Sequence, residues 1–327
     1  MKDTEFVQIS TRVRASLGVL SHSDRIRKAV DAASSLPSLC AAVRSMMPQD
    51  ASVPEDASLD GLCDIYLGSA VKLVRSLAPE DGMYDSLFYR YDAANLKLCI
   101  KASVRSLGMP ELFPFGTVDT KTVAEAAEKR DFSRLPEGMA RGCAEGLEEY
   151  AATGDAMAID LCIDRGCFED TERSAAASGV GILKKIASFD ADSANTTAFA
   201  RICAMKLPAE TKRAVFSRAF VSGGEISASL FPTGDFTFAA LKSALAGSRF
   251  APLVSGTDEN DFSVSLLEDK LSKARGELLG SVRFIPFGAD VPAAYILERE
   301  DEVRAFSLIG AYIQKGAAPS EIAEALA

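Results

Sequence analysis

The stretch "AAYILEREDEVRAFSLIGAYIQ" at residues 293–314 decides the fold class of this chain. Its large apolar side chains recur every three or four residues, which is the period of an α-helix. Five of them share one side of a helical wheel: Tyr295, Val303, Phe306, Ile309 and Ile313. Gly316 predicts the end of this helix, and Pro319 with Ser320 predicts the start of a last short helix.

The same spacing of three and four residues recurs along most of the 327 residues, and alternating strand patterns are scarce. Apolar residues make up 48% of the chain and charged residues 25%, so the chain can bury a sizeable core. The seven cysteines form no CxxC pair, which favours free, mostly buried thiols in a reducing compartment. We predict a soluble, all-α protein.

The charge balance excludes several classes of function. With 36 basic and 46 acidic residues the net charge is −10, which argues against binding to nucleic acid or to anionic lipid. The longest uncharged stretch, residues 32–43, contains Pro37 and is too short to cross a bilayer. The opening "MKDTEF" lacks the apolar core of a signal peptide, so we expect a cytosolic chain without lipid insertion.

Motifs for catalysis and cofactor binding are missing from the sequence. No GxxxxGK[ST] phosphate loop and no GxSxG nucleophile turn occurs. The single histidine, His22, lies in "LSHSD", where we expect a turn between helices. One histidine supports neither a zinc site nor a histidine-based triad. We therefore predict no catalytic residue, no cofactor, no metal and no small-molecule substrate.

Two similar tetrapeptides stand one hundred positions apart: "DAAN" at 92–95 and "DSAN" at 192–195. In each, an acid and an amide three residues later share one face of a helix. Asn95 precedes Lys101 by six residues, as Asn195 precedes Arg201. A glycine with a β-branched residue close behind it follows later in both copies, as Gly116-Thr-Val and Gly224-Glu-Ile.

A second likeness extends the repeat. Residues 158–168 resemble residues 265–274, with Asp160 matching Glu268. About 30 residues beyond each, an acid opens a further motif: Asp192 in one case and "EVRA" at 302–305 in the other. We predict three helical units around a pseudo-threefold axis, at 1–125, 126–246 and 247–327, the third degenerate and all part of one continuous body.

The repeated polar residues have two interpretations. The structural one is that Asp92 with Asn95, and Asp192 with Asn195, cap free N–H groups or fix a helix crossing, and we favour it. The catalytic one makes Asp92 and Asp192 a carboxylate pair. Glu302 interrupts the apolar side of its helix, so we expect it to find a cationic or N–H partner.

The acidic run "EREDE" at 298–302 also has two interpretations. It could be a metal cluster, but no histidine or loop of backbone oxygens accompanies it. We favour a solvated helix face on which Arg299 and Arg304 offset the acids.

Three stretches together resemble a known family. They are "RYDAANLK" continuing to Lys101, "FDADSANTTAFAR" at 189–201, and "AAYILEREDEVRAFSLIGAYIQKGAAPSEIAEAL" at 293–326. They are similar to the C subunit of archaeal and bacterial V/A-type rotary ATPases, whose vacuolar counterpart is called the d subunit. "STRVRASLGVL" at 10–20 resembles the first helix of that family.

The resemblance implies a funnel of three similar helical units without catalytic activity of its own. Such a protein sits peripherally on the cytoplasmic face of the membrane, between the proteolipid ring and the central stalk. It passes rotation between them and so couples ion transport to ATP synthesis or hydrolysis.

The chain departs from the family pattern in its third unit. The usual acid-Val-Arg-Asn is Glu302-Val-Arg-Ala305, and the usual Gly-Lys after it is Gly310-Ala311. Ala305 removes the amide from which we would expect the third matching contact. The competing hypotheses are a helical scaffold unrelated to ATPases and the helical enzyme described above.

Overall fold

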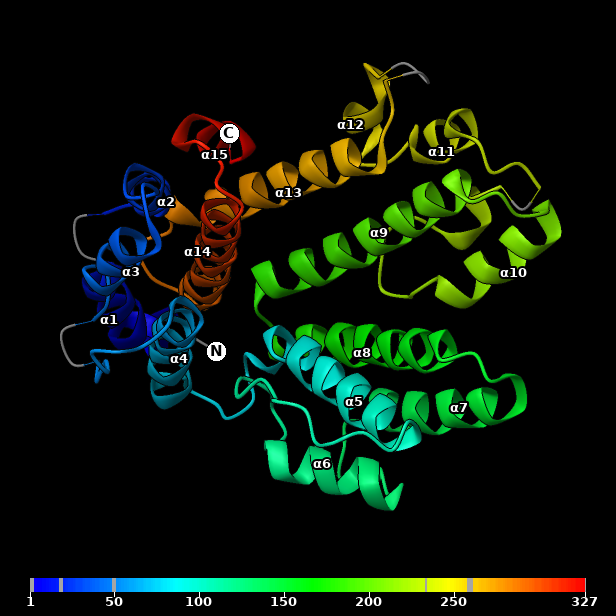
Figure 1. The fold of residues 1–327 in the computed structure, drawn as a ribbon, viewed down its shortest axis with the longest axis horizontal. Coiled ribbons are helices and arrows are strands. Elements are labelled where there is room, and N and C mark those ends of the chain that lie inside the picture. Colours follow the sequence, from blue (N-terminus) through cyan, green and yellow to red (C-terminus); the bar gives the residue numbers. More distant parts are fainter. Residues whose placement is uncertain (1–2, 18–19, 49–50, 233, 258–260, 327) are drawn as a thin grey trace. The chain divides into compact units, whose positions relative to one another are not determined.

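The computed structural model describes residues 3–17, 20–48, 51–232, 234–257 and 261–326. Within these ranges the chain forms fifteen α-helices, four short 3-10 helices and no strand, which confirms the predicted all-α class (Figure 1). The chain divides into two compact units. We call Met1–Met83 with Ser281–Ala327 the terminal unit, and Tyr84–Gly280 the central unit.

The terminal unit is built from both ends of the sequence. Its early elements are η1 (Asp3–Phe6), α1 (Val7–Leu17), α2 (His22–Asp31), α3 (Leu36–Arg44) and α4 (Leu59–Leu77), and its late elements are η4 (Ser281–Phe284), α14 (Asp290–Gln314) and α15 (Pro319–Ala325). The long helix α14 packs against α4 most extensively, and also against α1, α2 and α3. Fourteen of its residues are buried, so α14 is the central helix of this unit.

The central unit is one continuous segment. It runs through η2 (Asp85–Leu87), α5 (Tyr89–Val104), α6 (Thr120–Lys129), α7 (Glu137–Thr153), α8 (Met157–Ser178), α9 (Gly181–Ala204), α10 (Ala209–Ala219), η3 (Ala228–Leu230), α11 (Phe238–Leu245), α12 (Ala251–Ser255) and α13 (Val264–Gly280). Helices α7 and α8 pack along each other, and α5 lies against α8 (Figure 1). Helix α13 packs against α9 in the same way.

Two hydrophobic clusters lie among the described residues of the central unit. The first joins α5 to α8 around Leu96, Ile100 and Met139. The second joins α9 to α13 around a set of phenylalanines that includes Phe199 and Phe231. Each cluster contains one copy of the repeated tetrapeptide helix, so the helices that carry the motifs are held by their apolar neighbours.

The helix predicted from residues 293–314 is confirmed as α14, which begins three residues earlier. Gly316 follows it with φ of 76°, a backbone conformation that a glycine adopts without strain. Helix α15 begins at Pro319 as expected. His22, expected in a turn, is instead the first residue of α2, because Ser21 caps that helix in a reciprocal pair with Asp24.

All seven cysteines are free thiols, five of them buried. Burial raises the pKa of Cys143 and of Cys167 to about 12, so these thiols stay protonated and unreactive at neutral pH. Among the described helices, none combines the length and the apolar character that crossing a bilayer requires.

Candidate functional site

The first tetrapeptide lies on α5 and holds the loop that follows this helix. Asp92 accepts hydrogen bonds from the backbone N–H of Thr117 at 2.8 Å and of Val118 at 3.1 Å, and from the Thr117 hydroxyl at 2.7 Å. Asn95 donates to the Phe113 carbonyl and accepts from the Phe113 N–H, both at 2.8 Å. Both motif side chains are fully buried. We call this arrangement of Asp92 and Asn95 with residues 113–118 the α5 loop clamp.

The second tetrapeptide makes the same contacts on α9. Asp192 accepts from the N–H of Glu225 at 3.2 Å and of Ile226 at 2.9 Å. Asn195 donates to the Val221 carbonyl at 2.9 Å and accepts from the Val221 N–H at 2.8 Å. We call this arrangement, with residues 221–226, the α9 loop clamp. Its carboxylate has a further donor, because the Arg249 guanidinium lies 3.0 Å from Asp192.

Each clamp requires a glycine at one position of its loop. The glycine stands three residues after the residue that the asparagine holds: Gly116 after Phe113, and Gly224 after Val221. A Cβ atom on either glycine would lie 2.1 Å from the Oδ1 atom of Asp92 or Asp192. The two loops therefore pass equally close to the Oδ1 atom of their aspartate. In both copies this close contact leaves no room for a side chain, so the position requires glycine.

A basic residue of each motif helix pairs with an acid on the helix packed beside it. Lys101 on α5 lies 2.8 Å from Asp160 on α8. Arg201 on α9 lies 2.6 Å from Glu268 on α13. These are the four positions that the sequence repeat matched. Ion pairs of this kind contribute only about 0–1 kcal/mol to the stability of the fold. Their positions show that α5 packs on α8 in the same register as α9 packs on α13.

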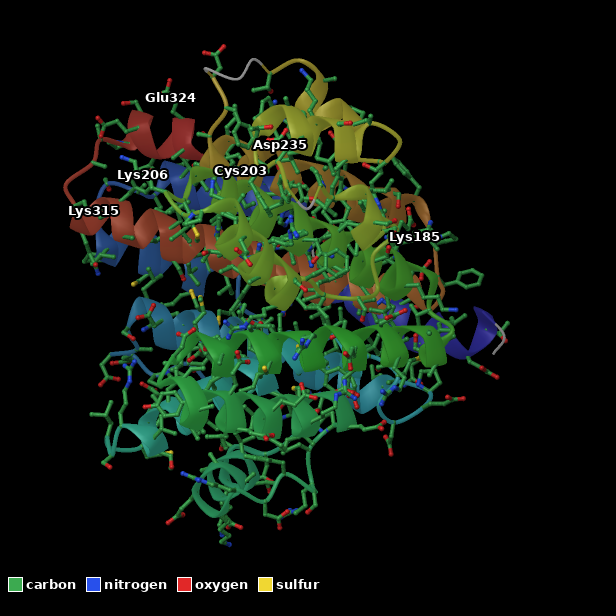
Figure 2. The ribbon with its side chains drawn as sticks, turned by 90° about the vertical axis from the view of Figure 1, so that its right-hand side faces the viewer. Lys185, Cys203, Lys206, Asp235, Lys315 and Glu324 are labelled. Atoms are coloured by element: carbon green, nitrogen blue, oxygen red, sulfur yellow. The ribbon has the colours of Figure 1, made fainter. Side chains whose placement is uncertain are left out.

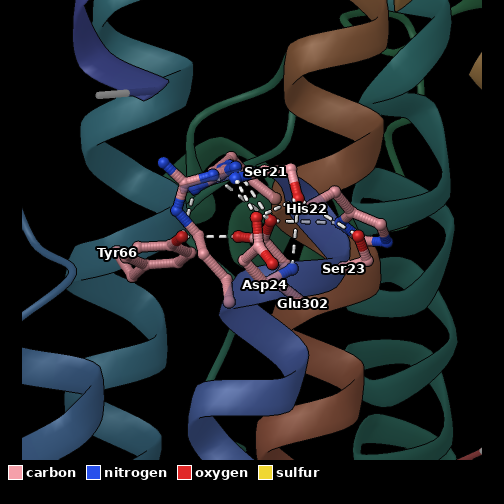
Figure 3. A network of polar contacts seen from close by, with 8 residues as sticks. Ser21, His22, Ser23, Asp24, Tyr66 and Glu302 are labelled. Atoms are coloured by element: carbon pink, nitrogen blue, oxygen red, sulfur yellow. Dashed lines mark hydrogen bonds and ion pairs between the residues drawn. The ribbon is translucent and has the colours of Figure 1, made fainter. Parts of the chain in front are cut away.

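Glu302 on α14 lies in a cluster of polar side chains (Figure 3). This environment differs from that of Asp92 and Asp192. Glu302 is fully buried, and the Arg299 guanidinium donates to it at 2.8 Å. The His22 ring nitrogen Nδ1 lies 3.0 Å away and the Arg25 guanidinium 3.9 Å away. The Tyr66 hydroxyl of α4 donates to the other carboxylate oxygen, and Arg299 also contacts this hydroxyl. All these partners belong to the terminal unit.

The Tyr66 phenol is fixed as a donor by this cluster. Burial raises its pKa above the ordinary value, and the negative charge of Glu302 raises the pKa further. The phenol therefore remains protonated at any physiological pH. Glu302 is held by side chains rather than by backbone N–H groups, and the buried Ala305 stands where the other two motifs have asparagine.

The solvated-face interpretation of residues 298–302 is wrong for most of this run. Arg299 and Glu302 are buried, as is Glu300 between them. Only the expected exposed pairing of Arg304 is found, with Asp301 at 3.1 Å. Arg299 turns inward because its charge meets that of Glu302 one turn later on the same helix face. Among the described residues, no group of three or more His, Cys, Asp or Glu side chains is arranged to hold a metal ion.

A further buried acid was not predicted from the sequence. Asp170 on α8 accepts from the N–H groups of Gly138 at 2.8 Å and Met139 at 2.9 Å, and so caps the first turn of α7. The close approach of α7 to α8 makes this possible. A Cβ atom on Gly142 would lie 2.3 Å from the Cys162 carbonyl oxygen. The spacing of Gly138, Gly142 and Gly146, one helical turn apart, is the signal that could have revealed it.

The family described as ATP synthase (C/AC39) subunit matches residues 48–325, a range that includes both loop clamps and Glu302. The chain belongs to this family. No curated protein matches the chain.

Membership in the C/AC39 family confirms the resemblance to the V/A-type ATPase component proposed from the sequence. The three stretches that carried the resemblance lie almost wholly within the matched residues. The likeness of residues 10–20 to a family first helix lies outside them and stays a prediction, although α1 includes most of this stretch. In this C/AC39 chain Asp92 and Asp192 contact loops of the chain itself, and neither clamp leaves a carboxylate exposed.

Proposed function

We propose that this chain is the non-catalytic rotor adaptor of a V/A-type rotary ATPase. It joins the membrane proteolipid ring to the central stalk and transmits torque between ion transport and ATP synthesis or hydrolysis. The family match supports a place in the ATPase. The observation that best supports the mechanical role is the pair of loop clamps, because the same rigid arrangement of hydrogen bonds occurs twice in the chain.

Torque transmission requires a body that deforms little under load. In each clamp, a buried carboxylate and a buried amide together hold a loop by four hydrogen bonds to its backbone. A loop held in this way cannot shift without breaking several buried hydrogen bonds, each costly to leave unmade. Close packing of the helices on both sides adds low compressibility. We further propose three units around a pseudo-threefold axis, with the boundaries given above, forming a funnel.

The same geometry supports the absence of catalysis. A general acid or base must reach a substrate atom within hydrogen-bond distance. Asp92 and Asp192 are fully buried and already accept hydrogen bonds at both oxygens. We therefore assign Asp92, Asn95, Asp192, Asn195 and Glu302 structural roles, and propose no small-molecule substrate.

The location that we propose is the cytoplasmic face of the membrane, with the chain bound through the proteins of the complex. A net charge of −10 disfavours direct adhesion to anionic lipid. Contact with the ring and the stalk would then be made by protein surfaces, and basic patches on those partners would complement the acidic surface of this chain.

The test is affinity purification of the tagged chain from gently solubilised membranes, followed by mass spectrometric identification of the proteins that accompany it. We expect the proteolipid and central-stalk subunits. Asp92→Ala and Asp192→Ala should each reduce the amount of ATPase subunits that accompany the chain. Neither change should remove an enzymatic activity of the isolated chain, as it would if the two aspartates were catalytic. Recovery of the folded chain without any ATPase subunit would overturn the proposal.

A further inference from the structure

The two loop-clamp helices share one more feature, an ion pair at a fixed distance from the motif. Lys101 follows Asp92 by nine residues, and Arg201 follows Asp192 by nine. Their partners, Asp160 and Glu268, lie in the first two turns of the helix packed against each motif helix. The α5 and α8 helices run antiparallel, since Lys97 pairs with Asp164 as Lys101 pairs with Asp160.

Helices α14 and α4 form a third pair of this kind. Tyr66 of α4 reaches Glu302, and a Cβ atom on Gly310 would lie 2.4 Å from the Leu59 side chain, so this pair is also antiparallel. The residue nine positions after Glu302 is Ala311. The first turn of α4 lies opposite it and carries Asp60. The acid of the pair is therefore present, and an alanine takes the place of the base.

An open surface pocket, which we call the cavity, lies where the missing base would be, and both Asp60 and Ala311 are exposed in it. Its volume is about 510 Å³, which exceeds that of a lysine or arginine side chain. Its lining includes Asp60, Ser58, Ser307, Ala311, Gln314 and Cys40. Within the described residues, Asp60 makes no ion pair. Lys315, at the end of α14 (Figure 2), lies one turn beyond Ala311 but is not within ion-pair distance of Asp60.

We propose that a lysine or arginine side chain from a neighbouring ATPase subunit enters this cavity and pairs with Asp60. It takes the place that Lys101 and Arg201 occupy within the chain. This inference rests on the proposed function, because it takes the partner to be a subunit of the same complex. A partly exposed ion pair adds little affinity, so its effect is to fix the orientation of the partner.

Carbodiimide cross-linking of the complex purified from membranes tests the proposal, because this reagent joins a carboxylate to a nearby lysine amine. The pair of Lys101 and Asp160 supplies an internal control in the same sample. A photo-reactive p-benzoylphenylalanine in place of Ala311 covers the case in which the partner residue is arginine. We expect an adduct between Asp60, or position 311, and a peptide of another subunit that contains the basic residue.

Two variants sharpen the result. Asp60→Asn should abolish the carbodiimide adduct at this site and leave the control adduct unchanged. Ala311→Lys supplies the base within the chain, so it should replace the intersubunit adduct by an intrachain one. A cross-link of Asp60 to Lys315 alone would overturn the proposal, as would no adduct from either reagent while the control adduct forms. In those cases the accompanying ATPase subunits would still support the proposed function, which fails only if they are absent.

Discussion

At the scale of single residues, the three motif acids solve one physical problem in two ways. A buried carboxylate is costly unless its charge is offset by donors. Asp92 and Asp192 accept hydrogen bonds from backbone N–H groups, to which Arg249 adds one guanidinium at Asp192. Glu302 is instead contacted by two guanidinium groups, an imidazole and a phenol. The arrangement around Glu302 places more charge in the core, so the loss of one member of the cluster should lower the stability of the fold.

Glu302→Leu should therefore destabilise the protein strongly. It removes the acceptor of Arg299 and Tyr66 and leaves buried positive charge without compensation, which typically costs about 3–5 kcal/mol. Denaturant unfolding followed by circular dichroism measures the loss. Arg304→Leu, on the exposed side of the same helix, is the control and should have a much smaller effect. An unchanged midpoint for Glu302→Leu would show that the cluster contributes nothing to stability.

Gly116→Ala and Gly224→Ala should each destabilise by about 1–3 kcal/mol, because the new methyl group overlaps a carboxylate oxygen. Gly108→Ala, in the same loop as Gly116, meets no atom within 4 Å and should change stability little. The cost of Gly116→Ala should shrink when it is combined with Asp92→Ala, since the overlapping oxygen is then absent. Equal costs in both backgrounds would contradict the steric explanation.

Glu298 gives a pH-dependent prediction. Burial is the main reason that its pKa is raised above the ordinary value of 4.5. A raised pKa means that the folded state binds the proton more tightly, so this contribution to stability is complete below pH 4.5 and is lost as pH rises through the folded pKa. Glu298→Gln should raise the melting temperature at about pH 7 and have a smaller effect near pH 4. A destabilised variant at neutral pH would reverse the sign and contradict this account.

At the scale of helices, the closest contact is that of α7 with α8, where three glycines of α7 face the α8 backbone. Gly142→Ala should separate the two helices and lower stability by about 1–3 kcal/mol, because its Cβ would collide with the Cys162 carbonyl. The matched control is Gly276→Ala in α13, which meets no atom within 4 Å and should gain about 0.5–1 kcal/mol of helix stability. Opposite signs in thermal unfolding would confirm the contrast, and equal signs would contradict it.

The sequence predicted the positions of helices better than it predicted which side chains contact one another in the folded chain. The period of residues 293–314 is a local property, and α14 follows it closely. The partners of Glu302 could not be predicted, because His22 and Tyr66 lie 280 and 236 residues away and come together only in the folded chain. The repeat matches Lys101 with Arg201 and Asp160 with Glu268, but it did not predict that each base pairs with an acid of the neighbouring helix, which only the structure shows. The prediction that Arg299 is exposed was wrong, because a run of alternating acidic and basic residues fits an exposed helix face as well as a buried ion pair.

At the scale of the whole molecule, a net charge of −10 predicts no affinity for lipid alone. The purified chain should stay in the supernatant when it is centrifuged with vesicles of anionic lipid at physiological salt, and vesicles of neutral lipid give the background. Membranes that contain the proteolipid ring should retain it. Binding to the protein-free anionic vesicles would contradict the view that proteins alone recruit this chain.

Because the terminal unit is built from both ends of the chain, it can complete its folding only at the end of synthesis. Residues 20–83 leave the ribosome long before residues 281–326, which supply the α14 helix that they pack against. The central unit needs no later segment, so it can fold first while the early helices wait with their apolar faces unpaired. A nascent chain stalled before residue 290 should therefore engage chaperones through its first 83 residues, whereas release of the full length should end that engagement.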